Sequence, residues 1–379
     1  MKLVLVTETY PPEVNGVAMT LERLVTNLIQ QGHEVELVRP KQKVDAEAPD
    51  FGYPVHTVPG IAIPGYADLQ FGWFAGGKLK KLWTANRPDV VHIATEGMLG
   101  FSALNVAKKL GIPVVTSFHT NFHTYGDHYN YKFVANWLMA YFRWFHNRTL
   151  ATFVPSQATV DDLEKYGFKN VKIFSRGVDT ELFGKHRRRE DLRHSWGVKN
   201  GDPVVVYVGR VAAEKNIPLT IAAYQRLKTH LPDAKLVVVG DGPERAGLEK
   251  KHPEIIFAGM RRGQELAEHY ASGDFFLFGS TTETFGNVLT EAMASELVVL
   301  GYDYAAAHHH VVDGENGFKA PFKDEPAFLN SVDRLVDAKP EWPAIRQSAR
   351  EKAQSLSWTS IIKGYADEVT KLAGLKDNA

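Results

Sequence analysis

The chain has 379 residues, no cysteine, and equal numbers of basic (44) and acidic (44) side chains. The lack of cysteine excludes a disulfide framework and a cysteine-ligated metal, and the charge balance gives none of the overall basic excess typical of nucleic-acid-binding proteins. No run of the sequence approaches the ~18 apolar residues of a membrane span. We therefore expect a cytoplasmic globular protein that is long enough for two domains.

The first half opens with a strand, a glycine-containing loop, an amphipathic helix and a second strand. These are "KLVLV" (2–6), a loop containing Gly16, "MTLERLVTNLIQQG" (19–32) and "HEVELVRP" (33–40). This order predicts a βαβ unit. Further apolar strands follow, with helical segments between most of them: "DVVHIAT", "PVVTSFH", "ATFVPS" and "NVKIFS".

A charged segment at 184–202 precedes a second half with the same layout, and we interpret this segment as a linker. The pattern restarts with "PVVVYVGR", the helix "IPLTIAAYQRLKTHLP" and the strand "AKLVVVG". The sequence thus predicts an α/β protein with two Rossmann-like doubly wound domains facing a central cleft. The predicted boundaries are 1–185 for the first domain, 186–345 for the second, and 346–379 for a helical tail that packs back on the first domain.

Charged side chains follow two strands of the second half. Arg210 and Lys215 come after its first strand, at the edge where doubly wound sheets place ligands. Two cations there suit a phosphate or pyrophosphate, although a solvated pair is the competing interpretation. Glu283 and Glu291 flank the start of a later helix, and a helix N-terminus binds anions. The two carboxylates could bind hydroxyls on either side of a diphosphate, as in a sugar nucleotide; two surface glutamates without function are the alternative.

Several absent motifs narrow the chemistry. No Walker A sequence occurs, and no G-x-G-x-x-G follows a strand, which argues against ATPases and dinucleotide-dependent dehydrogenases. No D-x-D occurs, so we expect no cofactor and no metal-chelated diphosphate. We interpret the loop "HHH" at 308–310 as not metal-binding, because adjacent residues rarely converge on one ion.

The stretch "ETFGNVLTE" (283–291) resembles the E-x7-E motif of the retaining glycosyltransferases of family 4, which have the GT-B fold. Other stretches fit the same family in the same order, so the resemblance covers nearly the whole chain: "ETYPPEVNGV", "SFHTNFHTYG", "RWFHNRT", "SRGVDTELF", "VGR…EKN" and "YDYAAA…VVDGENGF". Within the family the chain is most similar to bacterial lipid glycosyltransferases, such as GDP-mannose-dependent α-mannosyltransferases and sulfoquinovosyl-diacylglycerol synthases.

The resemblance implies a role for each matching charged residue. Glu291 would bind the ribose of a nucleotide diphosphate sugar, and Glu283 its hexose. Arg210 and Lys215 would hold the diphosphate and stabilise the departing charge, so that no protein nucleophile is needed. The family retains the anomeric configuration, by front-face attack in which the leaving phosphate takes the acceptor proton. His119 would face the transferred sugar at the reaction centre.

The remaining donor contacts expected from the resemblance involve the backbone. A loop containing Gly16 could approach the diphosphate closely because glycine has no Cβ, although a plain turn would also need glycine there. Arg261, in the loop "GMRRGQE", is a candidate contact to the base. Backbone groups at the start of the motif helix would bind the phosphate and sugar: Phe285, Gly286, Asn287 and Val288. Nothing in the sequence separates a GDP-sugar from a UDP-sugar donor.

Basic and aromatic residues in the first half suggest where an acceptor lies. Lys78, Lys80 and Lys81 belong to "GGKLKKLW", and the segment 131–148 is rich in aromatic residues. Such segments suit an anionic membrane surface, though a buried helix with ordinary polar edges is the alternative for 131–148. With the resemblance, they favour a lipid acceptor, such as a diacylglycerol or glycosyl-diacylglycerol, and a peripheral location on the inner face of the cell membrane.

Three other functions remain open from the sequence. The acceptor could be a soluble sugar or sugar phosphate, the protein could be a nucleotide-sugar epimerase, or it could bind sugar nucleotides without catalysis. One local departure also stands out. The family usually has "ASGLPVVA" where this chain has "ASELVVLG", so Glu296 stands at a position suited to a left-handed glycine. Either the helix ends differently or Glu296 is strained.

Overall fold

The computed structural model describes residues 1–13, 15–42, 51–63, 66–119, 132–199, 201–283 and 286–375. The chain forms two compact units. The first comprises Met1–Arg176 and Ile361–Ala379, and the second comprises Gly177–Ser360. Within the described ranges, no helix combines the length and apolar character needed to cross a bilayer.

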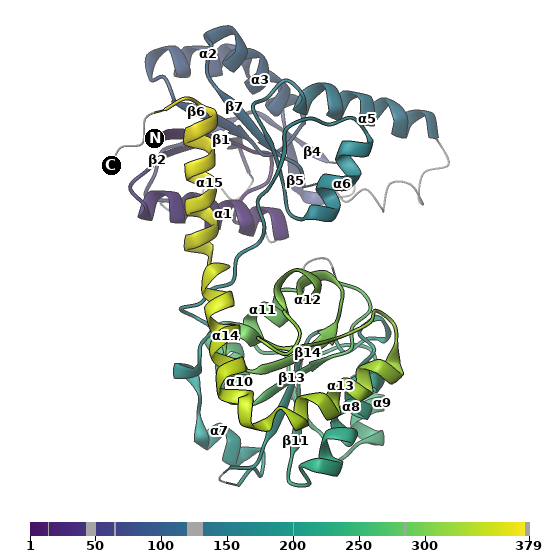
Figure 1. Ribbon diagram of the computed structural model, residues 1–379. Helices are drawn as coiled ribbons and strands as arrows, with labels where there is room; N and C mark the ends of the chain where they lie inside the picture. The colour runs from purple at the N-terminus through teal and green to yellow at the C-terminus, as the bar shows by residue number, and fades with distance from the viewer. Residues whose placement is uncertain are drawn as a thin grey trace. The chain divides into compact units, whose positions relative to one another are not determined.

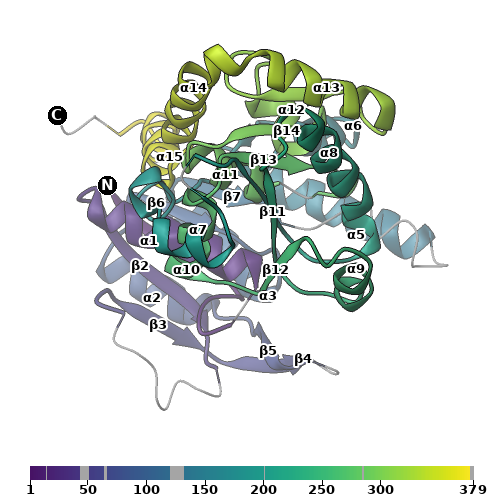
Figure 2. The same cartoon turned by 90° about the horizontal axis from the view of Figure 1, so that it is seen from below.

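The first unit contains a parallel sheet with the strand order β3-β2-β1-β6-β7-β8-β9. Its strands are β1 (Lys2–Val6), β2 (Glu34–Pro40), β3 (Val55–Val58), β6 (Val90–Ile93), β7 (Val114–Ser117), β8 (Thr152–Val154) and β9 (Val171–Ile173). A separate antiparallel pair, β4 (Gly60–Ile63) and β5 (Tyr66–Gly72), is visible beside β3 in Figure 2. Reversal of the strand order at β1 is the signature of a doubly wound sheet.

Helices cover both faces of this sheet (Figure 1). They are α1 (Gly16–Gln30), α2 (Gly76–Ala85), α3 (Met98–Leu110), α5 (Lys132–His146), α6 (Gln157–Lys165) and α15 (Trp358–Leu372). On one face, Val4 and Val91 share a core with residues of α2 and α3. On the other face of the sheet, the His92 ring of β6 and the Tyr365 hydroxyl of α15 share a hydrogen bond of 2.8 Å. Successive strand residues point to opposite faces, which explains why neighbours 91 and 92 serve different cores.

The second unit repeats this architecture, with the parallel strand order β12-β11-β10-β13-β14-β15. Its strands are β10 (Val204–Val208), β11 (Lys235–Val239), β12 (Ile256–Gly259), β13 (Phe275–Phe278), β14 (Val298–Tyr302) and β15 (Phe318–Ala320). Its helices are α7 (Glu190–Ser195), α8 (Ile217–His230), α9 (Arg245–Lys251), α10 (Gly263–Ala271), α11 (Asn287–Ala294), α12 (Ala305–His310), α13 (Glu325–Asp337) and α14 (Trp342–Ser355). Short 3₁₀ turns occur at Lys185–Arg187, Ala213–Lys215 and Lys339–Glu341. Helices α8 and α13 lie side by side (Figures 1 and 2).

The segment predicted to be a linker is part of the second unit. Arg193 of α7 is only 2% exposed, and its guanidinium donates to the Ser272 carbonyl (2.7 Å) and to Asp274 (3.1 Å). The charges that suggested a solvated linker therefore satisfy buried groups at the start of β13. Phe183 also lies in the core of this unit, so the unit begins at Gly177 rather than after residue 185.

The predicted C-terminal tail is divided between the two units. Ile345, Ala349 and Ala353 of α14 are buried in the core of the second unit. From Ile361 onward the chain belongs to the first unit, where Tyr365 contacts the ring of Phe153. Only the last helix of the predicted tail packs on the first unit, because the apolar stripe of α14 is already covered by the second.

Candidate active site

The charged residues of the second unit gather where three neighbouring strands end. Lys215 follows β10, Glu283 follows β13, and Tyr304 follows β14. These strands are adjacent and parallel, so their carboxyl ends meet at one edge of the sheet. The loops that leave this edge therefore bring together residues that are far apart in sequence.

Lys215 and Glu283 form an ion pair at this edge. The Lys215 ammonium lies 2.5 Å from Glu283 Oε1 and donates to the Thr282 carbonyl at 2.8 Å. The Ser280 hydroxyl donates to the same carboxylate oxygen at 2.9 Å. The side chains of Lys215 and Glu283 are 19% and 15% exposed, so both are largely buried but remain accessible to a ligand. Among the described residues no donor contacts Oε2, which leaves this oxygen able to accept from a ligand hydroxyl.

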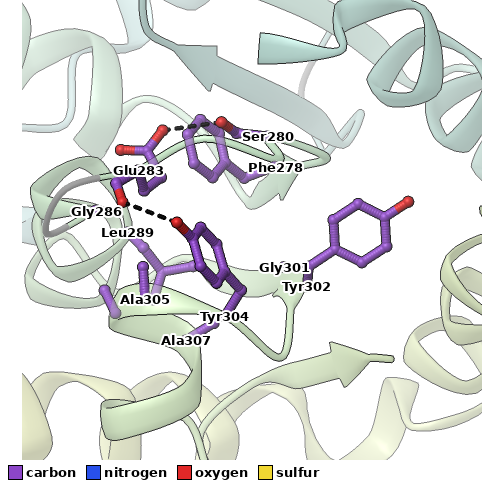
Figure 3. Close-up of a pocket in the computed structure, with 11 residues that line it drawn as sticks. Phe278, Ser280, Glu283, Gly286, Leu289, Gly301, Tyr302, Tyr304, Ala305 and Ala307 are labelled. Atoms are coloured by element: carbon purple, nitrogen blue, oxygen red, sulfur yellow. Dashed lines mark hydrogen bonds between the residues drawn. The ribbon is translucent and has the colours of Figure 1, made fainter. Parts of the chain in front are cut away.

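Tyr304 fixes the backbone of the Glu283 loop. Its hydroxyl donates to the Glu283 carbonyl at 3.2 Å, and its ring stacks on Phe322 with a centroid distance of 4.5 Å. Figure 3 shows Tyr304 reaching toward this carbonyl, whereas the ring of Tyr302 points away from it. A cavity of about 20 Å³ lies between this loop and α12, which is room for about one water molecule.

The start of α11 offers backbone donors beside the ion pair. Gly286 is its N-cap residue and has a left-handed φ of 75°, and no side chain within the described ranges caps the helix. A Cβ at Gly286 would lie 2.9 Å from Ala306 Cβ, so glycine is required both by conformation and by space. Asn287 and Val288 form the first turn, where N–H groups have no intrahelical partner. Phe285 lies outside the described residues.

Glu291 occupies a different environment from Glu283. It lies on α11, and the Tyr270 hydroxyl donates to its Oε2 at 3.0 Å. Burial raises the pKa of Glu291 to about 7, while the Tyr270 hydrogen bond acts to lower it. The same hydroxyl is 3.2 Å from the Val288 carbonyl, so Tyr270 ties the carboxylate to the first turn of the helix.

Two other predicted residues of the second unit, Arg210 and Arg261, pair with neighbours outside the Lys215–Glu283 site. The Arg210 side chain is 65% exposed and pairs with Glu214 at 3.3 Å. Arg261 donates to the Ala258 carbonyl at 3.1 Å, beyond the end of β12. The prediction that Arg210 and Lys215 converge on one anion thus stays a prediction, because Lys215 bonds to Glu283 instead. The three histidines at 308–310 lie on α12 rather than on a loop, and no metal-binding group of side chains was found in the described part of the chain.

His119 and Gly16 belong to the first unit. Burial lowers the pKa of His119 to about 4, so its ring is neutral at neutral pH. Its Nε2 is buried and has no hydrogen-bond partner among the residues that the structure describes. Gly16 begins α1, capped by the Asn15 side chain, which accepts from the Val17 and Ala18 N–H groups. A Cβ at Gly16 would lie 2.8 Å from Arg176 Nη2, so the guanidinium rests against the glycine.

Sequence reasoning missed the side chains that hold these groups in place. Ser280, Tyr304 and Tyr270 each hydrogen-bond a residue of the predicted motif or its backbone. Arg176 lies in "SRGVDTELF", a stretch that fits the family but for which the resemblance implies no residue role. Ser280, Tyr304 and Arg176 follow the ends of β13, β14 and β9, and Tyr270 lies on α10, but nothing in the local sequence indicates which groups they contact.

Lys78, Lys80 and Lys81 are exposed on α2, whose Leu79 and Trp83 are buried. Lys78 donates to the Thr57 carbonyl at 2.6 Å. The helix is thus amphipathic as predicted, with its basic face turned to solvent.

Two family models match the chain, one over each half. "Glycosyltransferase Family 4" matches residues 14–182, and "Glycosyl transferases group 1" matches 188–355. A GDP-mannose-dependent alpha-mannosyltransferase of Mycobacterium tuberculosis is 33% identical over 95% of this chain and 94% of its own length. The sulfoquinovosyl transferase SQD2 of Arabidopsis thaliana is 28% identical over 94% of this chain and 70% of its own. The alpha-monoglucosyldiacylglycerol synthase of Streptococcus pneumoniae is 29% identical over 80% and 71%.

Solved structures share the fold at lower identity. A glycosyltransferase from Rickettsia africae aligns with a TM-score of 0.73 and 15% identity, over 100% of this chain and 99% of that one. Anabaena Alr3699/HepE, solved in complex with UDP, aligns with a TM-score of 0.69 and 19% identity, over 98% and 100%. With two doubly wound units and a full-length relative at 33% identity, the chain belongs to the family 4 glycosyltransferases of the GT-B fold.

Proposed function

We propose that this protein is a retaining hexosyltransferase that moves a hexose from a nucleotide diphosphate sugar to a lipid acceptor at a membrane surface. The observation that carries the proposal is the Lys215–Glu283 pair beside the uncapped start of α11. A cation, a carboxylate with one free oxygen and a helix N-terminus together match the charges and hydroxyls of a sugar nucleotide. Relatives named for GDP-mannose and for diacylglycerol products support the donor and acceptor classes.

In the proposed reaction the acceptor hydroxyl attacks the anomeric carbon on the face from which the diphosphate leaves. The bond between that carbon and the phosphate oxygen breaks, and the leaving phosphate takes the acceptor proton. Lys215 and Arg210 would stabilise the charge that develops on the diphosphate, which makes a metal ion unnecessary in this proposal. Glu283 would orient the hexose by accepting from its hydroxyls, and Glu291 would do the same for the ribose.

Residues of the first unit would contact the transferred sugar, the diphosphate and the membrane. The neutral ring of His119 suits hydrogen bonding to a sugar hydroxyl better than proton abstraction, because a base with a pKa of about 4 is weak at neutral pH. Gly16 would let its loop approach the diphosphate. Lys78, Lys80 and Lys81 would contact anionic headgroups on the cytoplasmic face of the membrane.

Donor identity is tested by calorimetry with GDP, UDP and ADP, followed by turnover with the matching sugar nucleotides. Transfer to diacylglycerol or a glycosyl-diacylglycerol, with the donor's anomeric configuration retained in the product by NMR, would support the proposal. Glu291→Ala should weaken nucleotide binding, whereas Glu283→Ala should lower turnover more than affinity. Transfer only to soluble sugars would refute the lipid acceptor, and a new sugar nucleotide formed from the donor alone would indicate an epimerase.

A further inference from the structure

Three helices of the first unit carry basic residues and no acidic ones. Over α2, α3 and α5 the sequence contains seven lysine or arginine residues and neither aspartate nor glutamate. These basic residues are Lys78, Lys80, Lys81, Lys108, Lys109, Lys132 and Arg143. Because the whole chain has equal numbers of acidic and basic side chains, this is a strong local asymmetry. Figure 1 shows the three helices along one side of the first sheet.

A continuous row of aromatic rings, which we call the aromatic ladder, runs from the residues just before α2 across α3 and α5. In spatial order its members are Trp73, Phe74, Phe101, Trp144, Tyr141 and Trp137, and neighbouring ring centroids lie 5.6, 6.3, 6.0, 6.1 and 6.4 Å apart. Its two ends are open to solvent, since Trp73 is 45% and Trp137 65% exposed. Rings of this size are seldom left exposed in a row unless they meet a partner or a membrane.

Cations accompany the ladder along its length. The Arg148 guanidinium lies 4.3 Å from the ring centroid of Trp144. Between α2 and α3, a groove of about 410 Å³ is lined by Phe74 and Phe101 of the ladder and by Lys80 and Lys109. This groove is large enough for the headgroup of one phospholipid, and its two lysines would face the phosphate.

We infer that the aromatic ladder and the basic residues of α2, α3 and α5 together dock on an anionic phospholipid bilayer, with the aromatic rings at the level of the headgroups. Lysine and arginine beside exposed tryptophan are the combination that binds such interfaces, whereas a protein partner would not require the complete exclusion of acidic residues from three helices. The inference extends the proposed function, because a bound bilayer would supply the lipid acceptor. It also goes beyond the lysines of α2, since the ladder adds contacts that salt does not screen.

The test uses the full chain without donor or acceptor, and vesicles of phosphatidylglycerol or phosphatidylcholine. We expect at least tenfold tighter binding to phosphatidylglycerol at low salt. Lys78→Gln, Lys80→Gln and Lys81→Gln should each weaken this binding roughly fivefold. The double variant Trp137→Ala/Trp144→Ala should lower the affinity about tenfold even near 0.5 M salt, where the Debye length is roughly 4 Å. Lipids brominated near the headgroup should quench wild-type tryptophan fluorescence more than that of the double variant.

Ile29→Ala is the matched control, because Ile29 is exposed on α1 rather than on the three helices. It should bind vesicles like the wild type. Equal binding to both lipids, unchanged binding by the tryptophan variant, or no binding at all would each overturn the inference. Thermal unfolding curves of every variant distinguish a loss of vesicle binding from a loss of the folded structure. A chain that binds vesicles but glycosylates only soluble sugars would refute the proposed lipid acceptor and leave this docking surface intact.

Discussion

Replacing Lys215 tests the proposed chemistry most directly. Its ammonium contacts Glu283 Oε1 at 2.5 Å and the Thr282 carbonyl at 2.8 Å, so it is fixed by two groups before any ligand contacts it. Removing one fixed donor that stabilises charge in the transition state costs about 10²–10³ in turnover, or ~2.7–4 kcal/mol. We therefore expect Lys215→Ala to lower kcat by that factor.

The same substitution should change sugar-nucleotide affinity much less than turnover. The diphosphate is already anionic in the donor, but further negative charge builds up on it as the bond to the sugar breaks, so the interaction with Lys215 strengthens on the way to the transition state. Lys215→Arg should recover part of the rate, because it restores the charge but not the position of a compact ammonium. Ser280 still donates to Glu283 at 2.9 Å in either variant, which should keep the loop folded.

The assay is single-turnover transfer with saturating donor, run beside calorimetry of donor binding and a thermal unfolding curve. Lys250→Ala is the control, because Lys250 is an exposed lysine of α9 in the same unit. If kcat of Lys215→Ala stays within threefold of the wild type, the assignment of Lys215 to the diphosphate is wrong. If donor affinity falls as far as kcat does, Lys215 contributes ground-state binding rather than catalysis.

Three further predictions concern single residues. Because the pKa of Glu291 is raised to about 7 and a carboxylate accepts hydroxyl hydrogen bonds best when ionised, donor affinity should rise from pH 6 to pH 8, and calorimetry should find this rise lost in Glu291→Gln. Tyr304→Phe removes the hydrogen bond to the Glu283 carbonyl and should lower kcat several-fold with little change in donor Kd; equal losses in both would contradict a positioning role. Glu296 has a φ of 60°, so Glu296→Gly should raise the free energy of unfolding by about 1 kcal/mol in denaturant titrations, and a loss of stability would show that its 3.8 Å contact with Lys185 matters more.

The strained position of Glu296 was one of two possibilities that the sequence left open. The structure selects it: α11 ends at Ala294, and Glu296 adopts the left-handed conformation that glycine would favour. The alternation of apolar strands and amphipathic helices was also readable in the sequence, because central strands such as β6, β10 and β13 are buried on both faces and most helices have one apolar stripe. That pattern predicted the two doubly wound domains, whereas the order of the strands within each sheet is known only from the structure.

The sequence could not predict which groups the charged segments contact. The stretch 184–202 reads as solvated by composition, yet Arg193 is buried because Asp274 and the Ser272 carbonyl lie opposite it. Such pairs are distant in sequence, and nothing local marks them. The same limit hid Tyr270 and Tyr304, which bond the motif from other strands and helices.

The two glutamates of the motif show why a spacing alone cannot assign roles. Glu283 precedes α11 and Glu291 lies within it; Glu283 is held by an ammonium and a hydroxyl, whereas Glu291 is half-buried against a single phenol. A diphosphate at Lys215 would compete with Glu283 for the ammonium, and Glu283 Oε1, once released from Lys215, could accept from the hexose as Oε2 already can. Among the residues that the structure describes, no cation pairs with Glu291, so a ligand must supply donors of its own, as ribose hydroxyls do. The same residue type thus suits the reacting sugar at one end of the helix turn and passive anchoring at the other, and the difference arises from the partners that the fold brings to each.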